Sequence, residues 1–142
     1  MGAVSATIPE DALRRWFASN LDLIISQGDE TATTYFRAQP WTLACDDEEC
    51  RDIAALYNAD PSNDVVAGAA LVLIGIKDDG DLLDVAPWDA APLVQKLRDK
   101  LSPAPELRVV RFHAQGKHLD AVLILRGRDG PCIPTVELVS SL

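Results

Sequence analysis

The first regular pattern of hydrophobic positions lies between residues 13 and 25. Apolar side chains recur there at helical spacing and form one stripe: Leu13, Trp16, Phe17, Leu21, Ile24 and Ile25. Thr7 and Glu10 stand three residues apart ahead of the stripe, as in a capping box, and Pro9 is tolerated in a first turn. Gly28 suits the left-handed residue that ends many helices. The pattern predicts a leading helix over residues 7–27.

The middle of the chain alternates between strand and helix patterns. Residues 31–37 are β-branched and aromatic and precede Pro40, which predicts a strand. Four acids at 46–49 precede a helical apolar face and favour a helix N-terminus, which predicts a helix over 46–58. The continuous apolar run 69–76 predicts a strand covered on both faces. The turn residues 77–81 then predict a hairpin into a strand at 82–85.

The C-terminal part predicts one more helix and three strands. After Asp89 a helix places Leu93, Val94, Leu97 and Leu101 inward and stops before Pro103. Strands at 107–113 and 118–126 flank a four-residue loop around Gly116, and residues 135–139 form a last short edge strand. The order of elements predicts an α+β fold: a mixed, largely antiparallel sheet with about three helices. We expect one domain over 1–142, with the leading helix at 7–27 and the sheet and remaining helices within 31–142.

Composition narrows the class of protein. A chain of 142 residues suits a single core. Cys45, Cys50 and Cys132 form neither an even disulfide framework nor a C-x-x-C pair, so we expect reduced thiols. The longest apolar run, 65–76, is shorter than the roughly 20 residues that cross a bilayer, and the N-terminus has no secretory pattern. We therefore expect a cytoplasmic protein without a membrane span.

The net charge of −9 is unevenly spread along the chain. Residues 1–90 hold 17 acidic and five basic side chains, whereas residues 91–142 hold eight basic and five acidic ones. One face could therefore be basic on an acidic body, although a solvated surface without a partner explains the same numbers.

Several short strings, in order, resemble the Schlafen-type Alba-like DNA-binding domain family, which includes stand-alone bacterial members. Gly28-Asp29-Glu30 followed by Tyr35-Phe36-Arg37, then Ala55-Leu56-Tyr57-Asn58, resemble the motifs at the start of the family domain. Residues 69–80 resemble its buried strand and glycine turn, and residues 96–105 resemble its Lys-Leu-Arg-x-Lys-Ile-Ser-Pro-x-Pro string. The matching positions singled out are Glu30, Tyr35, Phe36, Arg37, Asn58, Gly75, Asp78 and Gly80.

The resemblance implies a nucleic-acid-associated regulatory domain, often paired, so a homodimer is expected. Some Schlafen proteins cut RNA with three acidic residues, but here Tyr35 replaces the second acid and Lys77 lies near the place of the third. A divergent metal-dependent RNase therefore stays only an alternative, because a hard cation needs several carboxylates. We expect no catalytic residue, no metal and no cofactor.

Basic residues of the last third are the candidates for phosphate contact, because Lys and Arg make most such contacts. They are Lys96, Lys100, Arg108, Arg111, Lys117, Arg126 and Arg128. Arg108 and Arg111 have opposite strand parity, so they should face opposite sides of the sheet. The alternative is a basic protein partner bound by the acids at 46–49 and by Asp78, Asp79, Asp81 and Asp84. His113 and His118 flank the hairpin loop and are expected to form a cross-strand pair rather than a zinc site.

Overall fold

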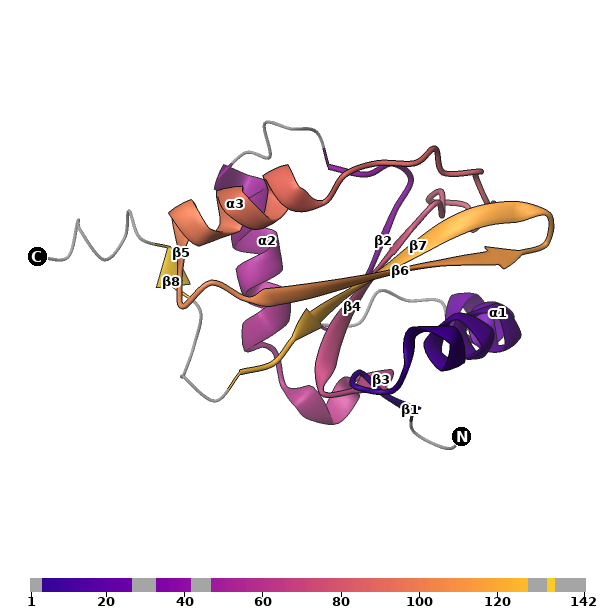
Figure 1. Ribbon diagram of the computed structural model, residues 1–142, viewed down its shortest axis with the longest axis horizontal. Coiled ribbons are helices and arrows are strands. Elements are labelled where there is room, and N and C mark those ends of the chain that lie inside the picture. Colours follow the sequence, from indigo (N-terminus) through magenta and orange to yellow (C-terminus); the bar gives the residue numbers. More distant parts are fainter. Residues whose placement is uncertain (1–3, 27–32, 42–46, 128–132, 135–142) are drawn as a thin grey trace, which may run out of the picture.

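A computed structural model describes residues 4–26, 33–41, 47–127 and 133–134. Three α-helices accompany a mixed, largely antiparallel sheet, which confirms the predicted α+β class (Figure 1). In chain order the elements are β1 (Val4–Ser5), α1 (Glu10–Ser26), β2 (Thr34–Arg37), α2 (Asp47–Asn58), a 3-10 turn (Pro61–Asn63), β3 (Val66–Ala67), β4 (Ala69–Ile74), α3 (Ala91–Lys100), β5 (Leu101–Ser102), β6 (Glu106–Ala114), β7 (Lys117–Leu125) and β8 (Ile133–Pro134).

Strand β4 is the centre of the sheet. It pairs antiparallel with β7, which in turn pairs antiparallel with β6. On its other side β4 pairs parallel with β2, and the short β3 links it to β1. All six residues of β4 are buried, as its continuous apolar run predicts. Strand β6 therefore lies at one edge of the sheet.

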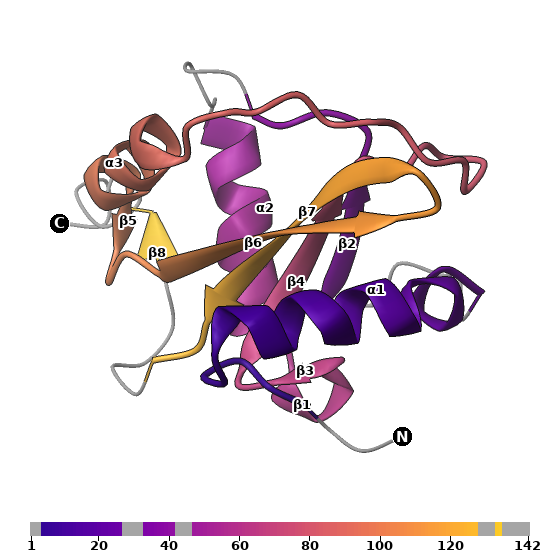
Figure 2. The ribbon, with the colours of Figure 1, turned by 45° about the vertical axis from the view of Figure 1, so that its right-hand side comes forward.

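Two hydrophobic cores lie on opposite faces of this sheet, because successive side chains of a strand point to opposite faces. Ala70, Val72 and Ile74 of β4 pack on the side of α2 and α3. Leu71 and Leu73 pack on the side of α1, against Phe17 and its neighbours. Figure 2 shows α1 on one side of the sheet and α2 and α3 on the other.

Helix α1 begins three residues later than the predicted start at residue 7. The hydroxyl of Thr7 lies 2.8 Å from that of Ser5. Residue 7 is therefore part of a turn, and the backbone carbonyl of Pro9 accepts the first helical bond, from the amide of Leu13 at 3.1 Å. The predicted buried stripe is confirmed, with Leu13, Phe17, Leu21 and Ile24 buried.

The predicted hairpin between β4 and a strand at 82–85 is wrong. The chain does reverse there, through an isolated bridge of Ile76 with Leu82 and a hydrogen bond of 2.7 Å from the amide of Leu83 to the carbonyl of Gly75, but residues 82–85 do not form a strand. Gly75, with φ of 107°, turns the chain out of the sheet. Beyond it the amide of Val85 donates to the carbonyl of His118 at 2.8 Å, so residues 77–90 lie against β7 instead. We call this stretch the 77–90 segment.

The hairpin of β6 and β7 is confirmed, with a tighter loop than the four residues predicted. Ala114 pairs with Lys117, and the two residues between them have positive φ, 52° for Gln115 and 77° for Gly116. This is the geometry of a two-residue turn that matches the twist of paired strands. The predicted strand at 135–139 lies outside the described residues, while β8 pairs with β5 in a small separate sheet.

Candidate binding groove

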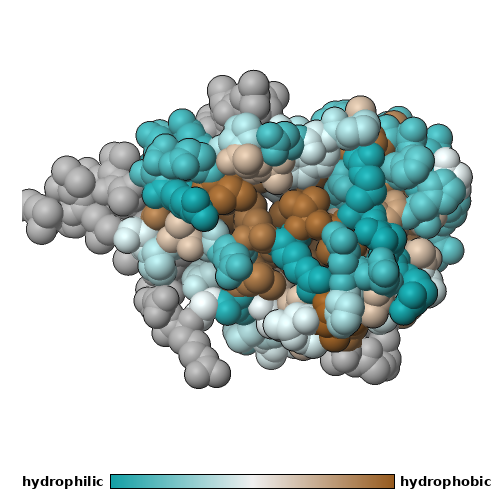
Figure 3. Space-filling model, in the orientation of Figure 1, coloured by the Kyte–Doolittle hydropathy of each residue, from teal (hydrophilic) through white to brown (hydrophobic). Residues whose placement is uncertain are grey.

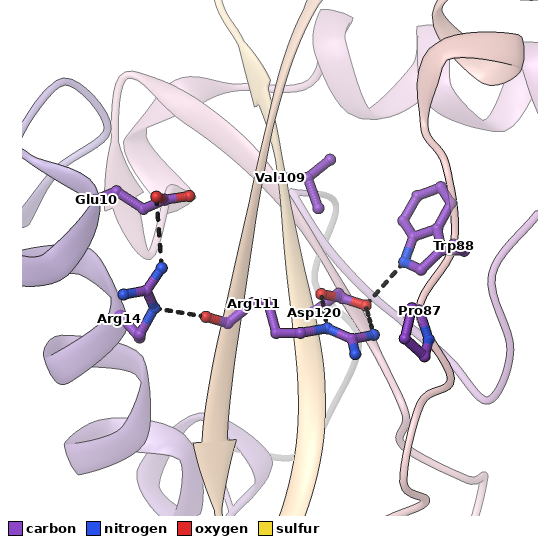
Figure 4. Close-up of a pocket in the computed structure, with 7 residues that line it drawn as sticks. All are labelled: Glu10, Arg14, Pro87, Trp88, Val109, Arg111 and Asp120. Carbon is purple, nitrogen blue, oxygen red and sulfur yellow. Dashed lines mark hydrogen bonds and ion pairs between the residues drawn. The ribbon is translucent and has the colours of Figure 1, made fainter.

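An open hollow of about 350 Å³ lies over the edge strand β6. Glu10 and Arg14 of α1 form one wall, and Pro87 and Trp88 of the 77–90 segment form the other. Its floor is made by side chains from β6 and β7: Val109, Arg111 and Asp120 (Figure 4). Figure 3 shows hydrophobic side chains between hydrophilic rims in the middle of the face where β6 runs in Figure 1. We call this feature the β6 groove.

A buried ion pair forms the charged part of the floor. Asp120 is 1% exposed, and Arg111 donates to both of its carboxylate oxygens, at 3.1 and 2.9 Å. The indole nitrogen of Trp88 donates to the same carboxylate at 2.8 Å. These bonds to Asp120 raise the pKa of Arg111 above its ordinary value. The carboxylate of Asp120 therefore joins Arg111 of the floor to Trp88 of the wall.

The apolar part of the floor consists of half-buried side chains. Val109 projects from β6 and packs against the core beneath α2 and α3, as do Trp88 and Leu107, the latter outside the groove. The ring of Trp88 lies 6.3 Å from that of Trp41, centre to centre, which extends the apolar surface inward. A groove that combines apolar and charged side chains along the outer strand of a sheet is suited to binding.

Two of the predicted phosphate ligands instead hold the fold together. Arg108 donates to the backbone carbonyls of Ala6 and Ile8, both at 2.7 Å. Arg126 makes two bonds of 2.8 Å to Asp64 and another to the carbonyl of Tyr57. The side chains of Arg126 and Asp64 are only 13% and 3% exposed. Both arginines therefore have intramolecular partners.

The remaining candidate cations do not converge. Lys100 lies 3.5 Å from Asp47 in an exposed ion pair. Within the part of the chain that the structure describes, no carboxylate lies within 4.0 Å of Lys96 or Lys117. Lys96 belongs to α3 and Lys117 to the tip of the β6–β7 hairpin, at opposite ends of the molecule in Figure 1. Arg128 lies outside the described residues, and Arg108 and Arg111 face opposite sides of the sheet, as predicted.

The family-motif positions have varied surroundings. Tyr35 is exposed on β2 and Phe36 is half-buried beside it. Arg37 lies 3.3 Å from Glu49 and stacks over the ring of Trp41. The others lie at ends and turns: Asn58 closes α2, Gly75 follows β4, and Asp78 and Gly80 belong to the turn at the start of the 77–90 segment.

A candidate metal cluster is not found among the residues described. No three of their His, Cys, Asp and Glu side chains group closely enough to hold an ion, and Glu30 lies outside this set. His113 and His118 form the predicted cross-strand pair, with ring centres 4.9 Å apart. His118 also contacts Asp84, and the hydrogen bond from its backbone amide to that carboxylate, at 2.6 Å, lowers the pKa of Asp84. The sequence-based reading missed the β6 groove, although the lone acid Asp120 inside an apolar strand signals a buried pair.

Comparison with known proteins places the chain by fold. Neither a family model nor a curated protein matches the sequence. The DIP2311 protein of Corynebacterium diphtheriae matches 88% of this chain at a TM-score of 0.52 and 16% identity, and this chain spans 24% of that structure. The N-terminal domain of a RecG-related protein from Nitrosomonas europaea, named as a candidate ATP-dependent DNA helicase, matches 82% of this chain at a TM-score of 0.52 and 19% identity. This chain covers 78% of that domain.

These likenesses establish a shared fold, and the Schlafen resemblance stays a prediction. In the described part of the chain, no helix combines the length and the apolar composition that a bilayer crossing requires.

Proposed function

We propose that residues 1–142 form one non-catalytic binding domain that acts in association with nucleic acid. The observation that carries the proposal is the fold that this chain shares with the N-terminal domain of the RecG-related protein, 78% of which it covers. The name of that neighbour links it to a DNA helicase, and this link is the reason for proposing nucleic acid. The β6 groove supports a binding role.

The face of α3 is the surface best suited to phosphate contact. Lys96 and Lys100 lie four residues apart on one side of this helix, and Arg98 is exposed. The ion pair of Lys100 with Asp47 is exposed, and such pairs are worth about 1 kcal/mol or less, so a phosphate can compete for the lysine. Substitutions of Arg108, Arg111 or Arg126 would not test binding, because each would also disturb the fold.

Fluorescence anisotropy with labelled DNA and RNA, single- and double-stranded, tests the proposal. If two or three phosphates are contacted, affinity should fall about tenfold between roughly 50 and 200 mM salt. The variant Lys96→Glu/Lys100→Glu should abolish binding, while Arg15→Glu/Lys77→Glu, with the same change of net charge elsewhere, should retain most of it. Equal losses in both variants would refute a site on α3, and no binding at low salt would refute direct nucleic-acid contact.

A protein partner is the second candidate, favoured by the acidic surface and by the open β6 groove. Three acids begin α2, Asp47, Glu48 and Glu49, and the whole chain carries a net charge of −9. A basic protein is the partner that such a surface attracts. The expected homodimer also stays a proposal. Light scattering at several concentrations would test it, and the mass of a single chain throughout would refute it.

A further inference from the structure

We propose that the β6 groove binds an extended, basic segment of a partner protein, which adds to the edge of β6 as an extra strand. The inference rests on the second candidate function, a basic protein partner, and adds the binding site and the mode of binding. Three observations support it: the position of β6 as the outer strand of the sheet, its recessed edge, and the charge around it.

Alternate backbone groups of β6 point away from β7, along the outer edge of the strand. In an antiparallel pair only alternate residues exchange hydrogen bonds with the neighbouring strand. The carbonyl of Arg111 is bonded at 2.9 Å by the side chain of Arg14, so Arg111 belongs to the outward-facing set. Val109, two residues away, therefore also directs its amide and carbonyl outward. An added strand gains affinity from such groups.

The recessed position of this edge favours a peptide over a second folded copy. Glu10 and Arg14 stand on one side of Val109, and Pro87 and Trp88 stand on the other. A second copy would carry the same walls around its own β6, so its edge could not reach the floor. A single extended segment can enter, and its alternate side chains would meet Val109 and Trp88.

The charge of the groove favours a basic segment. Two guanidiniums, those of Arg14 and Arg111, are already shared among three carboxylates. Arg14 lies 3.4 Å from Glu10 and 2.8 Å from Asp11, and Arg111 is paired with Asp120. Glu10 and Asp11 are more than half exposed, and Glu106 at the start of β6 is also exposed. The excess negative charge would attract Lys or Arg side chains and steer them toward the edge.

A nine-residue peptide that alternates lysine and valine is the probe, with a glutamate–valine peptide as its matched control. Binding would be followed by nuclear magnetic resonance on the full chain, together with amide hydrogen exchange. We expect the lysine peptide to bind and to slow exchange at the outward amides of Val109 and Arg111. The amide of Val110, which faces β7, should change little.

Two pairs of variants locate the contact. Val109→Pro removes an outward amide and should weaken binding by about fivefold or more, whereas Val109→Thr keeps that amide and should not. Glu10→Lys should weaken binding of the lysine peptide, whereas Glu48→Lys, with the same change of charge on α2, should have a much smaller effect. Circular dichroism checks that each variant is folded. If Val109→Pro does not fold, the slowed exchange at Val109 and Arg111 in the wild type tests the site instead.

Several results would overturn the proposal. Equal binding of both peptides would refute the preference for a basic ligand. Slowed exchange at amides outside β6 would refute the location of the site. A dimer mass by light scattering that Val109→Pro converts to a monomer would show that a second copy occupies the edge. Displacement of the peptide by DNA would show that the groove is part of a nucleic-acid surface. If DNA does not bind through α3, the proposal for the peptide site is unaffected, so the two proposals fail separately.

Discussion

Three arginines of the C-terminal hairpin join parts of the chain that are far apart in sequence. Arg108 holds two carbonyls near the N-terminus, Arg111 holds the 77–90 segment through the carbonyl of Ala86, and Arg126 holds Asp64. A guanidinium suits this task because its five donors lie in a fixed plane and can serve several acceptors. Positive charge in the last third therefore serves the fold to a large extent.

Replacing Arg126 by alanine should lower the free energy of unfolding by about 3–5 kcal/mol, because it would leave the carboxylate of Asp64 buried without its partner. Lys100→Ala, which removes an exposed ion pair, should cost about 1 kcal/mol or less. Urea unfolding followed by circular dichroism compares the two. Similar costs would mean that Asp64 is solvated in the native protein.

Gly75→Ala should be strongly destabilising, by about 3 kcal/mol or more, because a Cβ atom there would lie 2.4 Å from Leu119 Cδ2 and 2.8 Å from Val85 Cγ2. Gly116→Ala is the matched control: its φ is also positive, at 77°, but nothing lies within 4 Å of the added atom. It should cost about 1–2 kcal/mol, the strain of a left-handed backbone alone. Thermal unfolding of both variants measures the difference. Equal costs would contradict the close packing around Gly75.

At the level of single residues, the sequence predicts burial better than it predicts partners. The apolar positions of α1 and β4 could be read from their spacing, since periodicity follows directly from helix and strand geometry. The pairing of Arg126 with Asp64, 62 positions away, could not be predicted from the sequence, because it depends on how β7 and the 3-10 turn meet in space. The sign of a residue's charge says nothing about whether its partner is a phosphate or a carboxylate of the same chain.

The 77–90 segment is an element without regular secondary structure over most of its length, and a few contacts hold it in place. Val85 and Asp84 bond to the backbone of His118, and Arg111 bonds to Ala86. Because the segment carries Trp88, these contacts also set the width of the β6 groove.

Asp84→Asn should make stability less sensitive to acid. The hydrogen bond from the amide of His118 lowers the folded pKa of Asp84. The stabilisation is therefore present above the unfolded pKa, about 3.9, and is lost as the pH falls through the lower folded value. Urea midpoints should differ between the wild type and the variant at pH 6 and should converge near pH 2. A constant difference across this range would show that the contact does not depend on ionisation.

The longer elements could be predicted from the sequence, and the short ones could not. Helices α2 and α3 and the β6–β7 hairpin have runs long enough to show a period and clear turn signals. Strands β1, β3 and β5 are two residues each, too short for any periodicity. The predicted hairpin of β4 failed because tertiary contacts with β7 take the backbone groups that a local strand pair would have used.

The whole molecule is two cores that share one sheet. Strands β4 and β7 contribute side chains to both, with Val72 and Val122 on one face and Leu71 and Leu123 on the other. Neither core can be lost without exposing the back of the strands that support the other. The protein should therefore unfold as one cooperative unit.

Single-tryptophan variants test this expectation. Trp16 packs on the α1 core, whereas Trp41 is buried in the core beneath α2 and α3. A chain that keeps only Trp16 and a chain that keeps only Trp41, with phenylalanine elsewhere, should each give a fluorescence midpoint in urea that coincides with the circular dichroism midpoint of the same variant. An earlier midpoint for Trp16 fluorescence would mean that α1 detaches before the sheet unfolds.

The position of α1 has a consequence for synthesis on the ribosome. This helix is translated before β4 and β6, yet it packs against both strands, and Arg108 of β6 bonds to the carbonyls that precede it. Its apolar stripe must stay uncovered until the β6–β7 hairpin, which completes the face of the sheet that it packs against, has been translated. Until then the nascent chain exposes the apolar side chains of α1 to solvent.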